Sequence, residues 1–358
     1  MKFKRILMFV GTRPECIKML PIFLELRKQN FKVEICDTGQ HTEMNSQVFK
    51  FFDVVPKYSL QSMKKGQSLS ELSSKMLMKS SSVIQEYDPD IVLVHGDTMT
   101  SFIGAFTAFL NKVKVGHVEA GLRTNNKWSP FPEEMNRVLI SDIADMHFTP
   151  TKEAQKNLLA EGIKSEDIFV VGNTAMDSLE YARSFSNKNY GKEQKKIIIT
   201  IHRRENHGEN LDLIINEIKT ISQNFKNITI VIPVHPNPNI KSKFHYELGH
   251  YKNIILTEPM GYREFVEEIL NADIIITDSG GIQEEVTFLG IPTLVVREYT
   301  ERPEAITFGP CKLFPIIKEE ISNEVETLLT DNEYYKSRSR KSDIFGDGSS
   351  AKSIIKHL

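Results

Sequence analysis

The sequence has 358 residues, more than one ordinary hydrophobic core accommodates, and this length is typical of two domains. Hydrophobic residues make up 40% and charged residues 26% of it, as in ordinary globular proteins, and a formal net charge of -2 offers no global field for nucleic acid or an anionic membrane. The three cysteines, Cys16, Cys36 and Cys311, include no CxxC pair, which argues against a disulfide framework and a zinc site. Because no apolar stretch approaches the roughly 20 residues of a membrane span, and Arg13 and Glu15 interrupt the first apolar run too early for a signal peptide, we expect a cytoplasmic protein.

Short apolar runs alternate with patterns of helical period in both halves of the chain. In the first half, strands are predicted at 5–10, 32–37, 91–95, 114–118 and 146–148, and helices near 14–29, 69–87, 100–110 and 132–143. In the second half, buried strands are predicted at 195–202, 228–235, 253–258, 273–279 and 292–298, with helices between them. Polar sequence near 170–194 predicts a linker, and the tail at 346–358 predicts a turn followed by a short helix.

This alternation predicts an α/β fold, because strands joined by crossover helices form parallel sheets that are covered on both faces. We expect two Rossmann-like, doubly wound parallel-sheet domains, at 1–170 and 171–345, with a cleft between them. Ligands of open parallel sheets bind beyond the carboxyl ends of the strands. The polar residues that directly follow each predicted strand are therefore the candidate site.

The turn after the first predicted strand, Gly11-Thr12-Arg13-Pro14-Glu15, favours an anion site. Pro14 suits the first helical position, and the N–H groups that a helix start leaves unpaired attract phosphate or carboxylate. Arg13 adds a planar fork for the same anions, and Lys18 lies about one helical turn further on. The alternative is an ordinary capped helix whose charges are solvated.

Carboxylates gather behind the next strands of the first half. Asp97 follows the third predicted strand, and Glu119 follows the fourth. Glu133 and Arg137 lie one turn apart at the start of a predicted helix, where Glu134 is more simply a partner of the helix dipole. Three carboxylates at one sheet edge would repel one another and raise the pKa of at least one, which is what proton transfer requires.

Basic side chains follow the strands of the second half. His202 and Arg203 come after one predicted strand, and His235 comes after the next. A single histidine is usually structural, but several strand-end histidines and arginines on one rim favour a site that binds an anionic ligand.

The stretch TDSGGIQEE at 277–285 is the sharpest signal of the second half. Ser279, Gly280 and Gly281 let a backbone approach an anion closely at a helix start, Glu285 could reach a ribose diol, and Arg302 supplies a second basic fork. The sequence contains neither GxGxxG nor GxxxxGK[ST], no HExxH, and no tyrosine followed four residues later by lysine. We therefore expect no nicotinamide cofactor, a second half that binds a nucleoside diphosphate, and a first half that performs acid–base chemistry.

These motifs resemble those of the non-hydrolysing UDP-N-acetylglucosamine 2-epimerases of bacterial surface-polysaccharide synthesis. The matching stretches occur in family order over nearly the whole chain: GTRPECIKM, GQHTEM, VLVHGDT, GHVEAGLRT, PFPEEMNR, HRRENHG, PVHPNPN, TDSGGIQEE and TERPEA. The resemblance implies a GT-B-like fold, a C-terminal helix at 346–358 that packs back on the N-terminal domain, and a UDP-binding C-terminal domain. It also implies reversible epimerisation of UDP-GlcNAc to UDP-ManNAc through elimination of UDP, a 2-acetamidoglucal and re-addition of UDP, without a cofactor.

Carried over position by position, the resemblance implies a role for each matching residue. The expected catalytic group comprises Asp97, Glu119, Glu133 and His202. The expected substrate-binding residues are Arg13, Lys18, Arg137, Met260, Phe265, Ser279, Gly280, Gly281, Glu285 and Arg302. Some bacterial members also have an allosteric UDP-GlcNAc site, whose residues match Gln40, His41, Arg203 and His235. This chain carries Glu43 where some members have a second glutamine. The resemblance further implies a homodimer that binds UDP-GlcNAc, UDP-ManNAc and UDP.

Other functions fit parts of the pattern. A hydrolysing epimerase would release free ManNAc and UDP from the same fold, and a close relative could act on another UDP-amino-sugar. A GT-B glycosyltransferase would need a separate acceptor site, and a non-catalytic sensor of sugar nucleotides would not need three clustered carboxylates.

Overall fold

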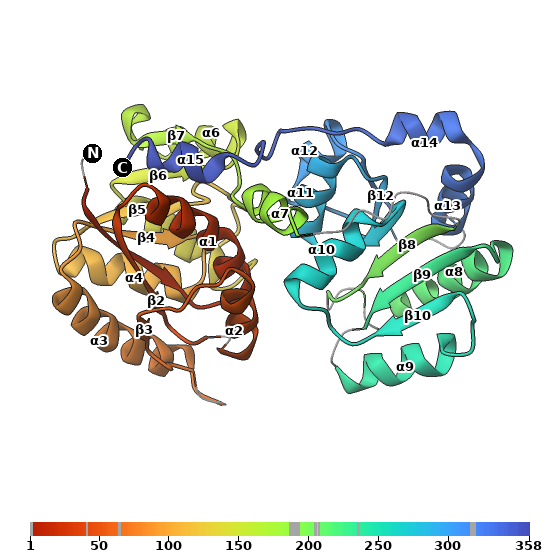
Figure 1. The fold of residues 1–358 in the computed structure, drawn as a ribbon, viewed down its shortest axis with the longest axis horizontal. Helices are drawn as coiled ribbons and strands as arrows, with labels where there is room; N and C mark the ends of the chain where they lie inside the picture. The colour runs from red at the N-terminus through yellow and green to blue at the C-terminus, as the bar shows by residue number, and fades with distance from the viewer. Residues whose placement is uncertain are drawn as a thin grey trace. The chain divides into compact units, whose positions relative to one another are not determined.

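The computed structural model describes residues 3–40, 42–63, 66–185, 194–203, 206, 208–234, 237–315 and 320–358 (Figure 1). The chain divides into two compact units, one formed by Met1–Tyr181 with Phe345–Leu358 and the other by Ala182–Ile344. The first unit thus continues past residue 170, where we expected the boundary. The part of the expected linker next to this boundary contains a helix, α7 (Ala175–Arg183), whose Met176 and Leu179 are buried.

The first unit is built on a parallel sheet of seven strands. Its strands are β1 (Arg5–Val10), β2 (Lys32–Asp37), β3 (Tyr58–Ser59), β4 (Ile91–His95), β5 (Lys114–Val118), β6 (Met146–Thr149) and β7 (Ile168–Val170). The strand order is β3-β2-β1-β4-β5-β6-β7, so the direction of winding reverses between β1 and β4. The strands predicted for this half of the chain are confirmed, and β3 and β7 are additional short strands at the two edges.

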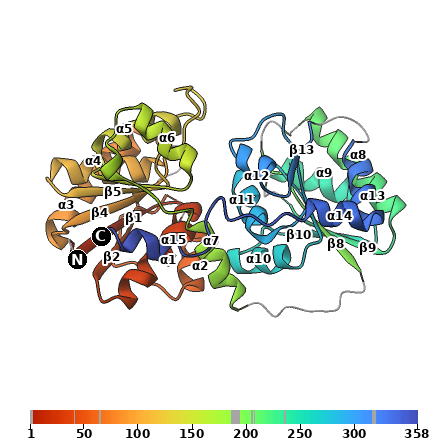
Figure 2. The ribbon, with the colours of Figure 1, turned by 90° about the horizontal axis from the view of Figure 1, so that it is seen from above.

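Helices cover both faces of this sheet. They are α1 (Arg13–Lys28), α2 (Thr42–Phe51), α3 (Leu69–Tyr87), α4 (Met99–Leu110), α5 (Glu133–Ile143), α6 (Lys152–Ala160), a 3-10 turn at Ser165–Asp167, α7 and α15 (Ser350–Ile355). Figure 2 shows α1 and α15 on one face and α4 and α5 on the other. Each face has its own hydrophobic core, because alternate side chains of the buried strands point to opposite sides.

The second unit repeats this architecture on a parallel sheet of six strands. Its strands are β8 (Lys195–Thr200), β9 (Ile228–Pro233), β10 (Ile254–Thr257), β11 (Ile274–Thr277), β12 (Thr293–Val295) and β13 (Cys311–Leu313). Its helices are α8 (Glu209–Asn224), α9 (Pro238–Leu248), α10 (Tyr262–Leu270), α11 (Gly280–Leu289), α12 (Pro303–Thr307), α13 (Glu320–Thr330) and α14 (Asn332–Arg338). The order β10-β9-β8-β11-β12-β13 places the reversal between β8 and β11. The predicted α/β fold class is confirmed in both units.

The three cysteines are buried and form no disulfide. None of the helices that the structure describes combines the length and hydropathy of a membrane-spanning segment.

The C-terminal helix α15 completes the first unit. It lies beside α1 and places Ile354 and Ile355 in the core on that face of the sheet. The carboxylate of Asp177, on α7, accepts hydrogen bonds from the N–H groups of Ser350 (3.1 Å) and Ala351 (2.9 Å) at the start of α15. Burial raises the pKa of Asp177 to about 6 in spite of these hydrogen bonds.

Asp177→Asn removes one acceptor from the start of α15, so we expect a lower midpoint of thermal unfolding than in the wild type. The pKa of Asp177 is higher in the fold than its value of roughly 4 in an unfolded chain, so the folded wild type loses stability as pH rises from 4 to 7. The variant has no proton to lose at this position. Its deficit is therefore expected to be largest near pH 4 and to shrink by roughly 1–3 kcal/mol by pH 7. Thermal unfolding of both proteins across this range measures the difference, and a deficit that grows with pH would contradict the assignment.

Candidate functional site

The turn between β1 and α1 surrounds a buried carboxylate of the chain itself. Glu15 is 1% exposed, and its Oε2 accepts hydrogen bonds from the N–H groups of Gly11 (3.0 Å) and Thr12 (2.7 Å). Its Oε1 accepts hydrogen bonds from the hydroxyls of Thr98 (2.5 Å) and Ser101 (2.9 Å) at the start of α4. Thr12 caps α1 in a capping box with Glu15. The N–H groups of Gly11 and Thr12, which we expected to face an external anion, are therefore hydrogen-bonded to Glu15 of the chain itself. Capping of α1 explains this part of the turn.

Glu119 lies directly after β5, where hydrogen-bond and ion-pair partners from separate segments converge on its Oε2. Lys18 on α1 forms an ion pair with this oxygen, Asn173 donates to it from its side-chain amide at 2.8 Å, and His95 at the end of β4 places Nε2 3.6 Å away. The backbone of Glu119 has φ +61°, a left-handed conformation that costs an ordinary residue about 1 kcal/mol or more. Strained backbone of this kind tends to occur where function requires a fixed side chain.

Asp97, after β4, forms an ion pair with Arg137 on α5 at 2.5 Å. Arg137 also contacts Glu134 at 2.9 Å, and Glu134 accepts hydrogen bonds from the N–H groups of Thr124 (2.9 Å) and Asn125 (2.8 Å). Burial raises the pKa of Glu134, but these two N–H groups and Arg137 outweigh it, so the pKa is lowered overall. Glu134 thus holds the loop before α5 rather than serving only the helix dipole.

Glu133, the first residue of α5, is half-buried. Among the described residues no hydrogen bond or ion pair to its side chain occurs. The other two predicted carboxylates, Asp97 and Glu119, follow the adjacent strands β4 and β5, as the sequence indicates. Each of those two has its own cation, which offsets the mutual repulsion that we expected.

His202 follows β8 in the second unit and contacts a buried acid that the sequence did not single out. Its Nδ1 lies 2.8 Å from Oδ1 of Asp278, which is fully buried after the neighbouring strand β11. Asp278 also accepts hydrogen bonds from the N–H groups of His202 (3.0 Å) and Arg203 (2.9 Å) and from the amide of Asn206 (2.9 Å). Burial raises the pKa of Asp278, but the contact with His202 and these hydrogen bonds lower it overall. Its position after a buried strand, in TDSGG, was an available signal.

The start of α11, directly after β11, has space beside its first residues. Ser279 caps α11 without a side-chain hydrogen bond to the helix, and a Cβ atom built on Gly281 would meet nothing within 4 Å. A Cβ atom built on Gly280 would lie 3.9 Å from Cζ of Arg302, so this guanidinium flanks the helix start. Arg302 is held there by Glu284 at 2.5 Å. An exposed helix N-terminus with an adjacent arginine suits an anionic group.

Three more of the predicted residues lie on or next to helices of the second unit. Glu285 is buried on α11, whereas Met260, before α10, and Phe265, on α10, are half-buried. Of the predicted allosteric residues, Gln40 accepts a hydrogen bond from the hydroxyl of Thr100 at 3.3 Å.

Arg203, another of the predicted allosteric residues, approaches Glu301 at 3.6 Å. Burial raises the pKa of Glu301, but Arg297 and Arg203 lower it to about 2. His41 and His235 lie outside the described residues. Arg13 lies in the first turn of α1.

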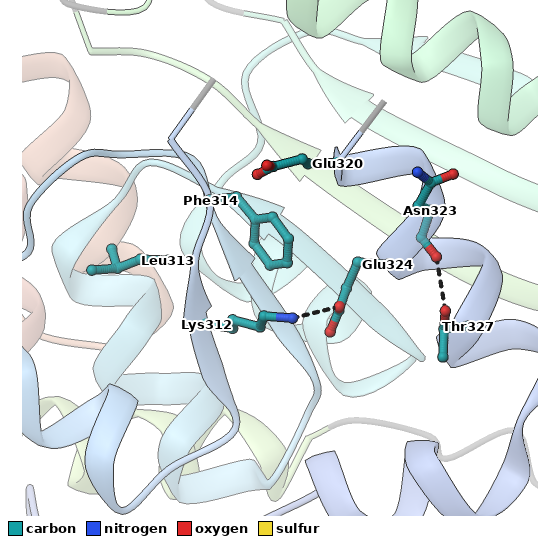
Figure 3. A pocket seen from close by; sticks show the side chains of 7 residues that line it. All are labelled: Lys312, Leu313, Phe314, Glu320, Asn323, Glu324 and Thr327. Atoms are coloured by element: carbon teal, nitrogen blue, oxygen red, sulfur yellow. Dashed lines mark hydrogen bonds and ion pairs between the residues drawn. The ribbon is translucent and has the colours of Figure 1, made fainter. Parts of the chain in front are cut away.

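Two cavities in the described part of the structure are lined by other residues. One of about 400 Å³ in the second unit lies beside β13 and α13, where Lys312 and Glu324 form an ion pair at 2.7 Å (Figure 3). Another, of about 370 Å³, lies in the first unit near Arg5 and Lys32. In the described part of the chain, no group of side chains is arranged to hold a metal ion.

Two parallel sheets, each with charged side chains beyond the point where its winding reverses, define an α/β protein of the GT-B-like, two-domain class. The crystal structure of the UDP-GlcNAc 2-epimerase from Neisseria meningitidis bound to UDP-GlcNAc matches it with a TM-score of 0.91 and 40% identity, over 99% of both chains. The Methanocaldococcus jannaschii UDP-GlcNAc 2-epimerase, solved in complex with UDP-GlcNAc and UDP, matches with a TM-score of 0.80 and 35% identity, again over 99% of both chains.

The sequence gives the same result. Residues 24–358 match the family model of UDP-N-acetylglucosamine 2-epimerase. The UDP-N-acetylglucosamine 2-epimerase of Escherichia coli (strain K12) is 42% identical over 368 residues, which cover 99% of this chain and 98% of that protein. The chain therefore belongs to the UDP-N-acetylglucosamine 2-epimerase family and is an enzyme of that family.

Asp278→Asn replaces a fully buried acceptor of several hydrogen bonds, so we expect a loss of about 2–4 kcal/mol in the free energy of unfolding at pH 7. Because the pKa of Asp278 is lowered in the fold, this contribution is present above about pH 4 and fades as pH falls further. Glu333→Gln is the control, since both side chains of its pair with Lys336 are exposed and a screened pair contributes no more than about 1 kcal/mol. Urea unfolding of the three proteins measures the losses, and equal losses would contradict this account of Asp278.

Proposed function

We propose that this chain interconverts UDP-GlcNAc and UDP-ManNAc by inverting C2, without hydrolysis and without a redox cofactor. One observation carries the proposal: two carboxylates at the ends of adjacent strands, Asp97 and Glu119, are each held by a cation from a helix, Arg137 and Lys18. A proton-transfer site requires fixed carboxylates, and a departing diphosphate requires fixed cations. The names of the relatives, UDP-GlcNAc 2-epimerases, support the choice of substrate.

The proposed reaction is an elimination followed by an addition. C2 of the sugar is not adjacent to a carbonyl, so removal of its proton alone is difficult. In the elimination, the C1–O bond to UDP breaks through an oxocarbenium-like transition state, and a carboxylate takes the C2 proton. A double bond then joins C1 and C2, and the product is a 2-acetamidoglucal. A proton then returns to the opposite face of C2, and UDP re-attaches at C1. No atom is gained or lost, so water must be kept from C1.

The first unit provides the groups for proton transfer in this proposal. Asp97, Glu119 and Glu133 surround C2, and Glu133 is the one that forms no ion pair among the described residues. Carboxylates in different environments suit opposite roles, because one face of C2 loses a proton while the other gains it. Lys18 and Arg137, together with Arg13 at the start of α1, would stabilise charge as UDP departs.

The second unit binds UDP in this proposal. The open N-terminus of α11, at Ser279, Gly280 and Gly281, and the adjacent Arg302 receive the diphosphate. In the same proposal Glu285 binds the ribose, and Met260 and Phe265 contact the uracil. His202, oriented by Asp278, lies near the diphosphate or the sugar.

The resemblance to non-hydrolysing bacterial epimerases supports further proposals about the setting of this reaction. The chain acts as a homodimer and supplies ManNAc-type sugars for surface polysaccharide. A second molecule of UDP-GlcNAc activates it at a site that includes Gln40, His41, Arg203 and His235. Such coupling is reciprocal, so the activator and the substrate would tighten each other's binding.

Proton NMR of the purified protein with UDP-GlcNAc in D2O, without added nicotinamide, tests the proposal. We expect UDP-ManNAc to form and both sugars to acquire deuterium at C2, because the proton returned to C2 comes from a group that exchanges with solvent. Free ManNAc with UDP would assign the chain to hydrolysing epimerases instead. No reaction would point to another UDP-amino-sugar.

Asp97→Asn, Glu119→Gln and Glu133→Gln test the acid–base assignment. Each is expected to lower kcat by roughly 100-fold or more while UDP still binds, because general acid–base groups contribute about 10²–10⁴-fold. Isothermal titration with UDP and the NMR assay separate binding from turnover. Glu153→Gln, in an exposed pair with Lys156 on α6, is the control and is expected to behave as wild type. A carboxylate whose amide variant keeps the wild-type kcat has no part in proton transfer.

A further inference from the structure

Asn173 is the described partner of Glu119 for which neither the sequence motifs nor the proposed mechanism provides a role. The residue is 3% exposed, and its Nδ2 donates to Oε2 of Glu119 at 2.8 Å. The basic side chains that face the same oxygen are Lys18, from α1, and His95, from β4. Asn173 therefore contributes a neutral donor to a carboxylate that otherwise meets basic side chains.

The orientation of the Asn173 amide is determined by its surroundings. Its Oδ1 accepts a hydrogen bond from the N–H of Ala175 at 2.9 Å, so the other amide atom, facing Glu119, has to be the nitrogen. An inverted amide would place two donors against each other and two acceptors against each other. A buried amide fixed in this way keeps its donor directed at one carboxylate oxygen.

The backbone of Asn173 is bound to the segment that returns from the second unit. Its N–H donates to the carbonyl of Phe345, the first residue of the returning part of the first unit, at 2.6 Å. The two segments are closely apposed, because a Cβ atom on Gly172 would lie 2.9 Å from Cα of Gly346. Asp177, on the outgoing side, accepts hydrogen bonds from the start of α15 on the returning side. Asn173 thus joins a strand-end carboxylate to the place where the chain leaves and re-enters the first unit.

We propose that Asn173 is a positioning residue for Glu119, through which the paired outgoing and returning segments hold this carboxylate in its working orientation. The inference rests on the proposed epimerase function. It explains why a side chain outside the strand-end motifs is buried and fully oriented beside Glu119. The strained backbone of Glu119 alone would not fix its carboxylate, because the side-chain torsions remain free to rotate.

Asn173→Asp is the sharpest test, because the variant keeps an oxygen for the N–H of Ala175 and replaces the donor to Glu119 with a second carboxylate oxygen. We expect kcat for UDP-GlcNAc to fall roughly 10- to 100-fold, because one charge-assisted hydrogen bond to Glu119 is lost. The change in KM is expected to be smaller. The acidic limb of the pH–rate profile is expected to move to higher pH, because a second negative charge beside Glu119 raises the pKa values of the pair. Asn173→Ser replaces the amide donor with a shorter hydroxyl and adds no charge, so it is expected to lower kcat without shifting the acidic limb.

Asp177→Asn is the structural control, because it weakens the hydrogen bonds at the start of α15 but leaves the bonds of Asn173 to Phe345 and to Glu119 in place. It is expected to change the unfolding midpoint while the pH–rate profile stays that of the wild type. If Asn173→Asp and Asn173→Ser keep the wild-type kcat, or change only the unfolding midpoint as Asp177→Asn does, the inference is overturned.

Carbon-13 NMR of the Glu119 carboxyl provides a readout that needs no substrate. Its titration is expected to shift to higher pH in Asn173→Asp relative to wild type, and an unchanged titration would overturn the inference. If wild type itself does not turn over UDP-GlcNAc, the proposed function fails, while this titration still decides whether Asn173 acts on Glu119.

Discussion

In each unit, a buried carboxylate lies where the strand order of the sheet reverses, and it fixes the two loops that meet there. Glu15 accepts hydrogen bonds from the turn after β1 and from Thr98 at the start of α4, so it joins the loops that follow the two strands on either side of the reversal. In the second unit Asp278, which follows β11, likewise joins two loops. It accepts hydrogen bonds from the N–H groups of His202 and Arg203, which follow β8. Burying an ion is costly unless several donors surround it, and these donors come from both loops. Each carboxylate therefore ties its two loops into one rigid rim.

The cations of the proposed site are oriented by acidic neighbours within the same unit. Arg137 contacts Asp97, and Arg302 contacts Glu284, so neither guanidinium has to be ordered from a freely rotating state when an anion arrives. A diphosphate that binds beside such a pair competes with a single carboxylate for the same donors. Because a diphosphate carries more charge than a carboxylate, this arrangement favours it over weaker anions.

The strand interiors and strand ends were predictable because buried parallel strands are continuous apolar runs and their ends carry isolated polar residues. The β13 strand was not predicted, since three residues show no period, and α7 was mistaken for a linker because its buried residues are separated by charged and small ones. Asp97 and Glu119 were identified from their place after strands. Asn173 could not be identified in this way, because its contact is with Glu119, which lies 54 positions away in the sequence. Asp278 was overlooked because it is buried in the core and contacts His202 from there. Sequence patterns identify residues at strand ends, which a ligand can contact. They identify less readily the buried residues that orient those side chains.

The discontinuity of the first unit has a consequence for the order of events during synthesis. Residues 182–344 form the second unit from one uninterrupted stretch, whereas the first unit needs residues 345–358 to complete the core beside β1 and α1. A ribosome therefore releases all of the second unit before the last helix of the first becomes available. Until then the surface of α1 that α15 covers stays exposed to chaperones and proteases. The unit that is begun first is in this sense the one that is finished last.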